Sequence, residues 1–464
     1  MKKDWTSGSV FKNLITFALP YFLSCFLQAL YGMADLYIVG RFNGTSSITA
    51  VSIGSQIMHM VTVMIVGLTM GSTVSIAEAI GAQNNERVNR FTGNTITLFT
   101  IISLISTAIL LLLAGGIVSL VSTPAEAIDG TRSYLLICFA GIPFITAYNV
   151  LSSIFRGLGD TKSPMYFIGV ACFFNIILDY LFMGPFQMGP AGAAVGTILA
   201  QLISVLIALY FLLHKKNGVT LSKEDFIPRK KYMQPIIRIG LPITLQDAFI
   251  QVSFITITII ANHRGLTDAA AVGIVEKFIS FIFLVPSSML SSVSALAAQN
   301  MGAGKHERAH KTLKYAVLIC IVFGASVTVL MQFIAEPIVR LFDSDPQVVI
   351  SGGQYLKGYV LDCMMAGVHF CFSGFFCAYG HSGISFIHNL ISIVTARIPG
   401  AYLMSIRFPD TLFPMGFAIG MGSLVSVIIC VSFYIIMSNR GRFGITKAAT
   451  GITGGPKDES FRCQ

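Results

Sequence analysis

Long apolar stretches alternate with short polar ones along almost the whole chain. Each stretch is near the length of about 20 residues that a helix needs to cross the hydrocarbon core of a bilayer. Membrane β-strands would instead show segments of roughly ten residues with alternating hydrophobicity. We therefore predict an all-α membrane protein with about twelve transmembrane helices. The predicted helices cover residues 14–39, 48–78, 94–121, 133–154, 165–183, 191–213, 236–261, 270–299, 315–342, 354–379, 385–405 and 413–437.

The second half of the chain repeats the first at an offset of about 221 positions, which is too long for a solenoid and indicates a duplicated domain. Because each repeat holds an even number of helices, we predict two six-helix lobes related by a pseudo-two-fold axis along the membrane normal. The expected parts are an N-lobe at 1–213 (helices 1–6), a linker at 214–234, a C-lobe at 235–437 (helices 7–12) and a loosely ordered tail at 438–464. Matched landmarks include Gly81-Ala82 with Gly302-Ala303, Glu86-Arg87 with Glu307-Arg308, Phe155 with Phe376, and Gly159 with Gly380. We expect the charged positions to form a turn and a solvated helix start, and assign no chemistry to them.

Composition and charge define the environment of the chain. Hydrophobic residues make up 54% and charged residues 11%, whereas a soluble protein is about a quarter charged. Most of the 31 lysines and arginines fall on the side that holds both termini, which predicts a multi-pass plasma membrane (cell inner membrane) protein with cytoplasmic termini and linker. The net charge of +10 then reflects topology, so we expect a lipid bilayer and no nucleic acid as partner. The cysteines lie mostly within apolar spans and lack zinc-site spacing, so no metal or cofactor is expected.

We single out five of the prolines inside the predicted helices, because each removes a backbone hydrogen bond and can bend its helix. A static kink and a moving hinge are both compatible with each of them. Pro20 and Pro242 occupy matched places in the first helix of each half, which favours a shared geometric role. The others are Pro143, Pro286 and Pro399.

Acidic side chains within apolar helices are costly and usually serve a function. In the first half, Asp35 and Asp179 are expected about four residues, roughly 6 Å, below the outer ends of their helices. Asn175 shares a helix face with Asp179, and Tyr134 and Thr197 are expected in the same layer. This oxygen-rich set predicts a pocket for Na+ or a proton. A structural hydrogen bond or ion pair between helices is the alternative.

The second half carries Asp247, Glu276, Asp362 and Arg397 within its predicted helices, with Lys277 at a similar depth. Ion pairing among these groups is one interpretation, and binding of substrate or a proton is the other. Methionine and phenylalanine side chains near Asp362 provide an apolar, adaptable surface that suits cations, although core packing explains the same residues.

Several segments together resemble the multidrug and toxic compound extrusion (MATE) family, in its prokaryotic branch. The resemblance covers residues 10–437. The segments are Ala34-Asp35 with Val39-Gly40, the two Gly-Ala links, Phe155-Arg-Gly-Leu-Gly-Asp-Thr-Lys162, Asn175-Ile-Ile-Leu-Asp179, Gly192-Ala-Ala-Val-Gly-Thr197 and Arg397-Ile-Pro399.

This resemblance implies a cation-coupled exporter. In similar proteins, an Asp of the first helix and an Asn and Asp of the fifth form the coupling-cation site. These positions correspond to Asp35, Asn175 and Asp179 here, with Tyr134 and Thr197 as neighbours. The resemblance also associates the first-helix proline, Pro20, with bending of that helix.

The leading hypothesis is multidrug efflux by secondary active antiport, in which small drug-like molecules or organic cations leave in exchange for Na+ or H+, by a chain that functions as a monomer. The alternative within transport is a lipid-linked precursor flippase, which would need a cationic cavity. A passive channel fits a duplicated, kinked bundle less well than alternating access does. An enzyme is not expected, because His263, His306 and His310 are predicted in loops without accompanying catalytic motifs.

Overall fold

All regular secondary structure in the described residues is helical, which confirms the predicted all-α membrane fold. The computed structural model describes residues 4–121, 123–214 and 219–444. Within these residues, 11 helical stretches are long and apolar enough to cross a membrane, and up to 12 if a pair bent by 51° forms one span. The first half contains α1 (Val10–Phe42), α2 (Thr45–Gly81), α3 (Asn85–Leu120), η1 (Ala125–Ala127), α4 (Ile128–Ala140), α5 (Ile142–Gly157), α6 (Lys162–Met183) and α7 (Gly189–His214). The second half contains η2 (Lys223–Phe226), α8 (Lys230–Asn262), α9 (Leu266–Ile282), α10 (Leu284–Gly302), α11 (His306–Arg340), α12 (Pro346–Tyr359), α13 (Leu361–Ala378), α14 (Ser382–Ser392), η3 (a π-helix, Ile393–Arg397), α15 (Ile398–Arg407) and α16 (Phe413–Asn439).

Several predicted single helices are divided into two. The apolar run 133–154 becomes α4 and α5, which are bent by 51° around Gly141. Pro143 lies in the first turn of α5, after the break at Gly141, where the missing N–H has no helical partner to lose. Pro399 instead lies inside the continuous helical stretch Ser382–Arg407, directly after the π-helix η3. Pro20 and Pro242 lie inside the continuous helices α1 and α8.

Two predictions about the ends of helices were wrong. His306 and His310 lie in the first turns of α11 rather than in a loop. The tail after α16 is not loose throughout, because Phe443 is completely buried and its ring lies 5.0 Å from that of Tyr379 and 5.2 Å from that of Phe375. Burial of this aromatic ring folds residues 440–444 back onto the C-lobe. The rest of the predicted tail lies outside the described residues.

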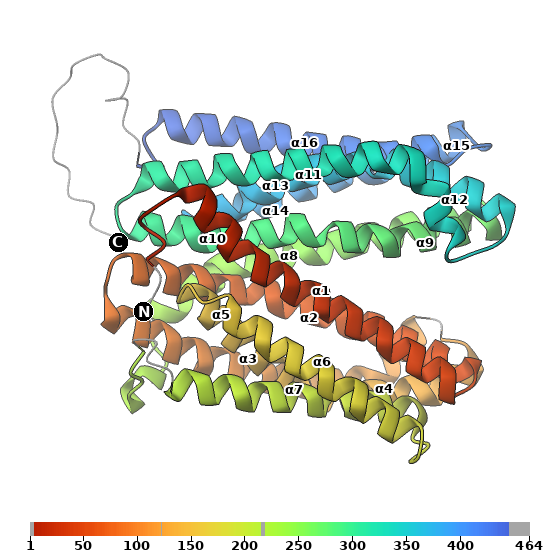
Figure 1. Cartoon of the computed structure of the whole chain (residues 1–464), viewed down its shortest axis with the longest axis horizontal. Coiled ribbons are helices and arrows are strands. Elements are labelled where there is room, and N and C mark those ends of the chain that lie inside the picture. The colour runs from red at the N-terminus through yellow and green to blue at the C-terminus, as the bar shows by residue number, and fades with distance from the viewer. Residues whose placement is uncertain (1–3, 122, 215–218, 445–464) are drawn as a thin grey trace.

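The helices form two groups that diverge along their length. Helices α1–α7 pack mainly with one another, as do α8–α16, and contacts between the groups are made chiefly by α2 with α8, α2 with α10 and α1 with α10. In Figure 1 the two groups come together at the end where α1 begins and α16 ends, and they separate toward the end that carries α4, α9 and α12. We call the first end the terminal end of the molecule.

Glycines allow the two groups to meet backbone to backbone at the terminal end. Four of them lie so close to a carbonyl of the other group that a Cβ would overlap it. Among the described residues, three side-chain hydrogen bonds between helices of the two groups also cross the junction. The glycine pairs are Gly71 with the Ile236 carbonyl, Gly240 with that of Leu68, Gly81 with that of Gln299, and Gly302 with that of Glu78. The bonds run from Gln299 Nε2 to Gly157 O (3.0 Å), Thr244 Oγ1 to Met64 O (3.2 Å) and Ser294 Oγ to Met70 Sδ (3.1 Å). We refer to this set as the seal.

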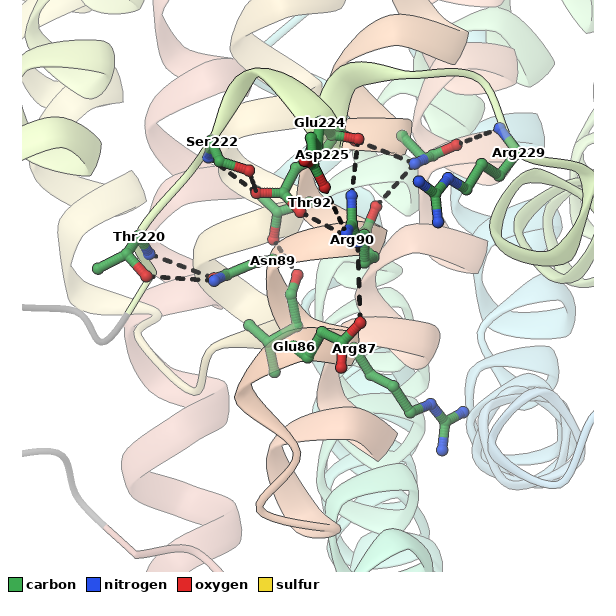
Figure 2. Close-up of polar contacts among 12 residues, drawn as sticks. Glu86, Arg87, Asn89, Arg90, Thr92, Thr220, Ser222, Glu224, Asp225 and Arg229 are labelled. Carbon is green, nitrogen blue, oxygen red and sulfur yellow. Dashed lines mark hydrogen bonds and ion pairs between the residues drawn. The ribbon is translucent and has the colours of Figure 1, made fainter.

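The chain that joins the two halves is fixed to α3. Figure 2 shows Arg90 of α3 between Glu224 and Asp225, with nitrogen–oxygen distances of 3.1 and 3.4 Å. The Asn94 amide donates to Asp225 O (3.0 Å) and accepts from Arg229 N (2.8 Å). The following residue begins α8, before the predicted end of the linker at 234. Residues 215–218 lie outside the described residues, whereas 219–229 hold a defined path along α3.

Candidate functional site

The structure brings the two acidic residues of the first half together. Asp35 of α1 and Asp179 of α6 are 6% and 0% exposed, respectively. The polar neighbours of the Asp35 carboxylate are Asp179, Asn175 and Thr197. They converge because α6 packs against both α1 and α7. Asn175 and Asp179 share a face of α6, and the Asn175 amide donates to Asp179 Oδ2 at 3.4 Å.

Oxygen atoms dominate this pocket and several remain without partners. A Cβ at Gly196 would overlap Asp179 Oδ1, so this glycine provides the space for the carboxylate. Buried polar atoms normally form hydrogen bonds, and unsatisfied ones call for a functional explanation. Two nearby carboxylates with uncommitted oxygens favour a bound cation or a shared proton. Among the described residues, the buried oxygens without a hydrogen-bond partner include Asp35 Oδ1, Asn175 Oδ1, Asp179 Oδ1 and Thr197 Oγ1.

Tyr134 lies beside this pocket rather than on its carboxylates. Its buried ring packs against Gly54 of α2, and it is close enough to Asp35 to interact electrostatically. Tyr31, which the sequence analysis did not select, stands in the same relation to Asp35. It lies four residues before Asp35, so the helical i, i+4 spacing could have identified it.

Pro20 is buried within α1, and its carbonyl accepts a hydrogen bond from Ser24 Oγ at 2.9 Å. Helix α1 continues through this position without interruption and reaches Phe42, beyond the predicted end at 39, so Asp35 lies deeper in its helix than expected. A role of Pro20 as a hinge stays a prediction.

Three of the four second-half candidates form a separate buried cluster around Arg397. Its Nη2 donates to the Tyr359 hydroxyl at 3.1 Å, and its guanidinium lies 5.0 Å from the Phe254 ring centroid. Asp362 and Glu276 interact with it electrostatically. Among the described residues, however, Arg397 has no carboxylate within ion-pair distance of 4.0 Å. Lys277 is exposed and lies outside this cluster.

Asp247 stands apart from this cluster, at the junction of the two halves. It lies on α8, one turn beyond Thr244 of the seal, and its Oδ2 would be 3.1 Å from a Cβ at Gly67 of α2. The residue is partly buried. Within the described part of the chain, no hydrogen bond or ion pair reaches its carboxylate.

Comparison with known proteins adds to this geometry. A family model described as MatE matches residues 20–181 and again residues 242–403. The probable multidrug resistance protein YpnP of Bacillus subtilis is 29% identical over 431 residues, which cover 93% of this chain and 95% of that protein. The probable multidrug resistance protein NorM of Thermotoga maritima is 29% identical over 401 residues, which cover 85% of each chain.

Solved structures share the architecture. One, described as the outward-facing conformation of a multidrug resistance MATE family transporter of the MOP superfamily, matches with a TM-score of 0.87 at 21% identity. The match covers 95% of this chain and 97% of that one. At this identity the similarity shows the fold alone. The two family-model matches, one in each half, agree with the internal repeat seen in the sequence.

Proposed function

Because this chain belongs to the MATE family, we propose that it exports drug-like, often cationic, molecules by secondary active antiport, with Na+ or H+ moving inward. The observation that carries this proposal is the buried pocket formed by Asp35 and Asp179. Two carboxylates from different helices, with uncommitted oxygens and an amide beside them, suit a small cation or a proton that binds and leaves. A purely structural pair would be expected to satisfy these atoms.

The coupling follows from differential binding. An ion shifts a conformational equilibrium only when it binds one state more tightly than the other. Helix α1 carries Asp35 in the pocket and, at its beginning, packs next to α10 and α11 of the other lobe. Bending or tilting of α1 would therefore change the pocket and the seal together. We place the terminal end in the cytoplasm, because the basic residues concentrate there.

The cargo is proposed to bind between the lobes, near Asp247. This carboxylate lies just beyond the seal and has no partner among the described residues. A cationic group of the cargo would neutralise the negative charge of the Asp247 carboxylate, and apolar side chains around it would contact the rest of a drug-like molecule. Arg397, in contrast, is packed between Tyr359 and Phe254 beside two carboxylates. Such a guanidinium offers little to an anionic pyrophosphate, so the flippase alternative is not favoured.

The test is efflux of a fluorescent cation from proteoliposomes under an imposed Na+ gradient and, separately, an imposed pH gradient. We expect one gradient to drive efflux by the parent protein. Asp35→Asn and Asp179→Asn should each abolish the gradient-driven component, because each removes a charge on which the ion depends.

The matched control is Asp410→Asn, which makes the same chemical change at an exposed carboxylate. It should transport like the parent. Undiminished gradient-driven efflux by both pocket variants, at equal protein incorporation, would refute the assignment of the coupling site. Efflux by the parent that follows neither gradient would refute antiport itself.

A further inference from the structure

The segment before α1, residues 4–9, lies across the junction of the two lobes at the terminal end. Trp5 is 6% exposed, and its indole Nε1 donates to Gly159 O at 2.9 Å, in the N-lobe link between α5 and α6. Its ring packs edge-on against Phe17, with centroids 5.4 Å apart. Gly159 has a φ of +88°, and a Cβ there would be 2.5 Å from the indole nitrogen. The absence of a side chain at this glycine thus leaves room for the indole.

The C-lobe binds the same segment through two cations at the beginning of α11. Lys305 Nζ donates to Thr6 O (2.8 Å) and Thr6 Oγ1 (3.1 Å). Arg308 donates from Nη1 to Gly8 O (2.9 Å) and from Nη2 to Ser7 O (3.0 Å). All four bonds join residues about 300 positions apart and connect the two lobes. They must break if the lobes separate at this end.

A second strap stands in a matching place. The linker before α8 lies on the beginning of α3, as Figure 2 shows, just as the segment before α1 lies on the beginning of α11. In each case the segment that precedes the first helix of one lobe is held by the third helix of the other. The duplicated Gly-Ala links lie beside these two helix starts. The pseudo-two-fold relation of the repeats therefore extends to the straps.

The two straps differ in how firmly they are held. In the linker strap Asp225 is buried (4% exposed), and the fully buried Asn94 amide both donates a hydrogen bond to the strap and accepts one from it. Removing a partner from such a buried network leaves unsatisfied polar groups, which is costly. The N-terminal strap is held instead by the exposed Lys305 and the half-buried Arg308, which water can solvate after release. Arg87, the first-repeat counterpart of Arg308, pairs with Glu78 of its own lobe at 3.2 Å, and its side chain makes no hydrogen bond or ion pair to the described part of either strap.

We propose that residues Asp4–Ser9 form a releasable clasp, which holds the lobes together at the terminal end and is released when that end opens, while the linker strap stays bound as a permanent anchor. This inference rests on the proposed transport function, because only alternating access requires the seal to part. Lys305 and Arg308 are the positioning residues of the clasp. The strength of the hydrogen bonds that these two residues donate to the clasp sets how readily the seal opens.

The experiment uses the full chain in proteoliposomes and two reporters. Trp5 is the only tryptophan in the sequence, so its emission maximum and its quenching by acrylamide follow release of the clasp. A cysteine introduced by Ser294→Cys, at a completely buried seal position, is labelled by an impermeant maleimide when the seal opens. In the double variant Lys305→Ala/Arg308→Ala we expect a red-shifted Trp5 emission, stronger quenching, and labelling faster by on the order of tenfold.

The matched control is Lys311→Ala, which removes a cation of the same helix whose ion-pair partner within the described residues is the exposed Glu307, at 2.7 Å. It should leave both signals unchanged. Unchanged signals in the double variant, or equal changes in the control, would overturn the clasp. If the double variant fails to fold, the test uses the protein that carries only Ser294→Cys. Under the ion gradient that speeds labelling at position 294, quenching of Trp5 must rise in parallel. Continued shielding of Trp5 from acrylamide would refute release of the clasp.

The outcome separates the clasp from the proposed antiport. In the clasp variants, Trp5 quenching measures release of the clasp and labelling at position 294 measures opening of the seal, and neither reading requires a transported ion. Should the clasp variants open the seal while Asp35→Asn and Asp179→Asn retain gradient-driven efflux, the coupling site is wrong and the clasp stands. Should the pocket variants lose efflux while the clasp variants change neither reporter, the clasp is wrong and the coupling site stands.

Discussion

A single methyl group at Gly302 should open the seal. A Cβ there would overlap the Glu78 carbonyl oxygen and lie 2.9 Å from the Glu78 carbonyl carbon and 3.1 Å from Ala82 N. Carbon atoms normally pack at about 3.5–4.0 Å, so α2 and α10 must separate by on the order of 1 Å to accept it. Overpacking of this kind costs about 1–3 kcal/mol.

That cost applies only while the seal is closed. In Gly302→Ala the ratio of closed to open molecules should therefore fall by roughly 5- to 150-fold. Ser294→Cys serves as the reporter, because Ser294 is completely buried and its Oγ lies 3.1 Å from Met70 Sδ of the other lobe. Its rate of labelling by an impermeant maleimide, applied at the terminal end, is proportional to the open fraction as long as that fraction is small.

Gly383→Ala is the matched control, because a Cβ there meets nothing within 4 Å. It makes the same substitution in a C-lobe helix and tests for a general effect of alanine on helix stability. A labelling rate for Gly302→Ala within about twofold of the parent, or an equal increase in the control, would show that the close backbone approach does not hold the lobes together.

Two other outcomes are expected. Asp247→Asn should raise the KM for a cationic substrate by on the order of tenfold and leave that for a neutral substrate unchanged, whereas equal changes for both would contradict a charge-specific role. The Asp4 carboxylate accepts hydrogen bonds from Thr6 Oγ1 and Thr6 N, both at 2.8 Å, which lower the pKa of Asp4 below its ordinary value of 3.8. Its contribution to the clasp is therefore complete above about pH 4 and is lost as the pH falls through the lowered pKa. Trp5 quenching should then stay constant from about pH 8 to 5 and rise only in stronger acid; a rise centred near pH 6 would indicate a histidine instead.

The sequence was informative where polar groups are rare. Asp35, Asp179 and Asn175 could be selected because ionisable and amide side chains within apolar helices have few structural uses, and helix periodicity placed Asn175 and Asp179 on one face. Depth along the helix then added Thr197, which the structure places beside Asp35. The distances between helices depend on how α1, α6 and α7 pack, and no local pattern encodes them.

Other features could not be predicted from the sequence, because they depend on contacts between distant parts of the chain. The bend at Gly141 lies within one uninterrupted apolar run, so hydropathy cannot distinguish two short helices from one. Arg308 looked like part of a solvated helix start, and only the folded chain brings it to Ser7 and Gly8. Phe443 follows a polar stretch, and its burial depends on aromatic rings of α11, α13 and α16.

The buried attachment of the linker to α3 limits how the lobes can move relative to each other. With Arg229 N held by the Asn94 side chain, the beginning of α8 has a fixed point on the opposite lobe. A rigid body fixed at one point rotates about it and cannot slide away from it. If the lobes rotate relative to each other, the first turn of α8 would be the natural pivot, and small rotations there would become large displacements at the far ends of α9 and α12. Lengthening the chain between residues 219 and 229 would disturb the axis of this rotation rather than give the lobes more freedom.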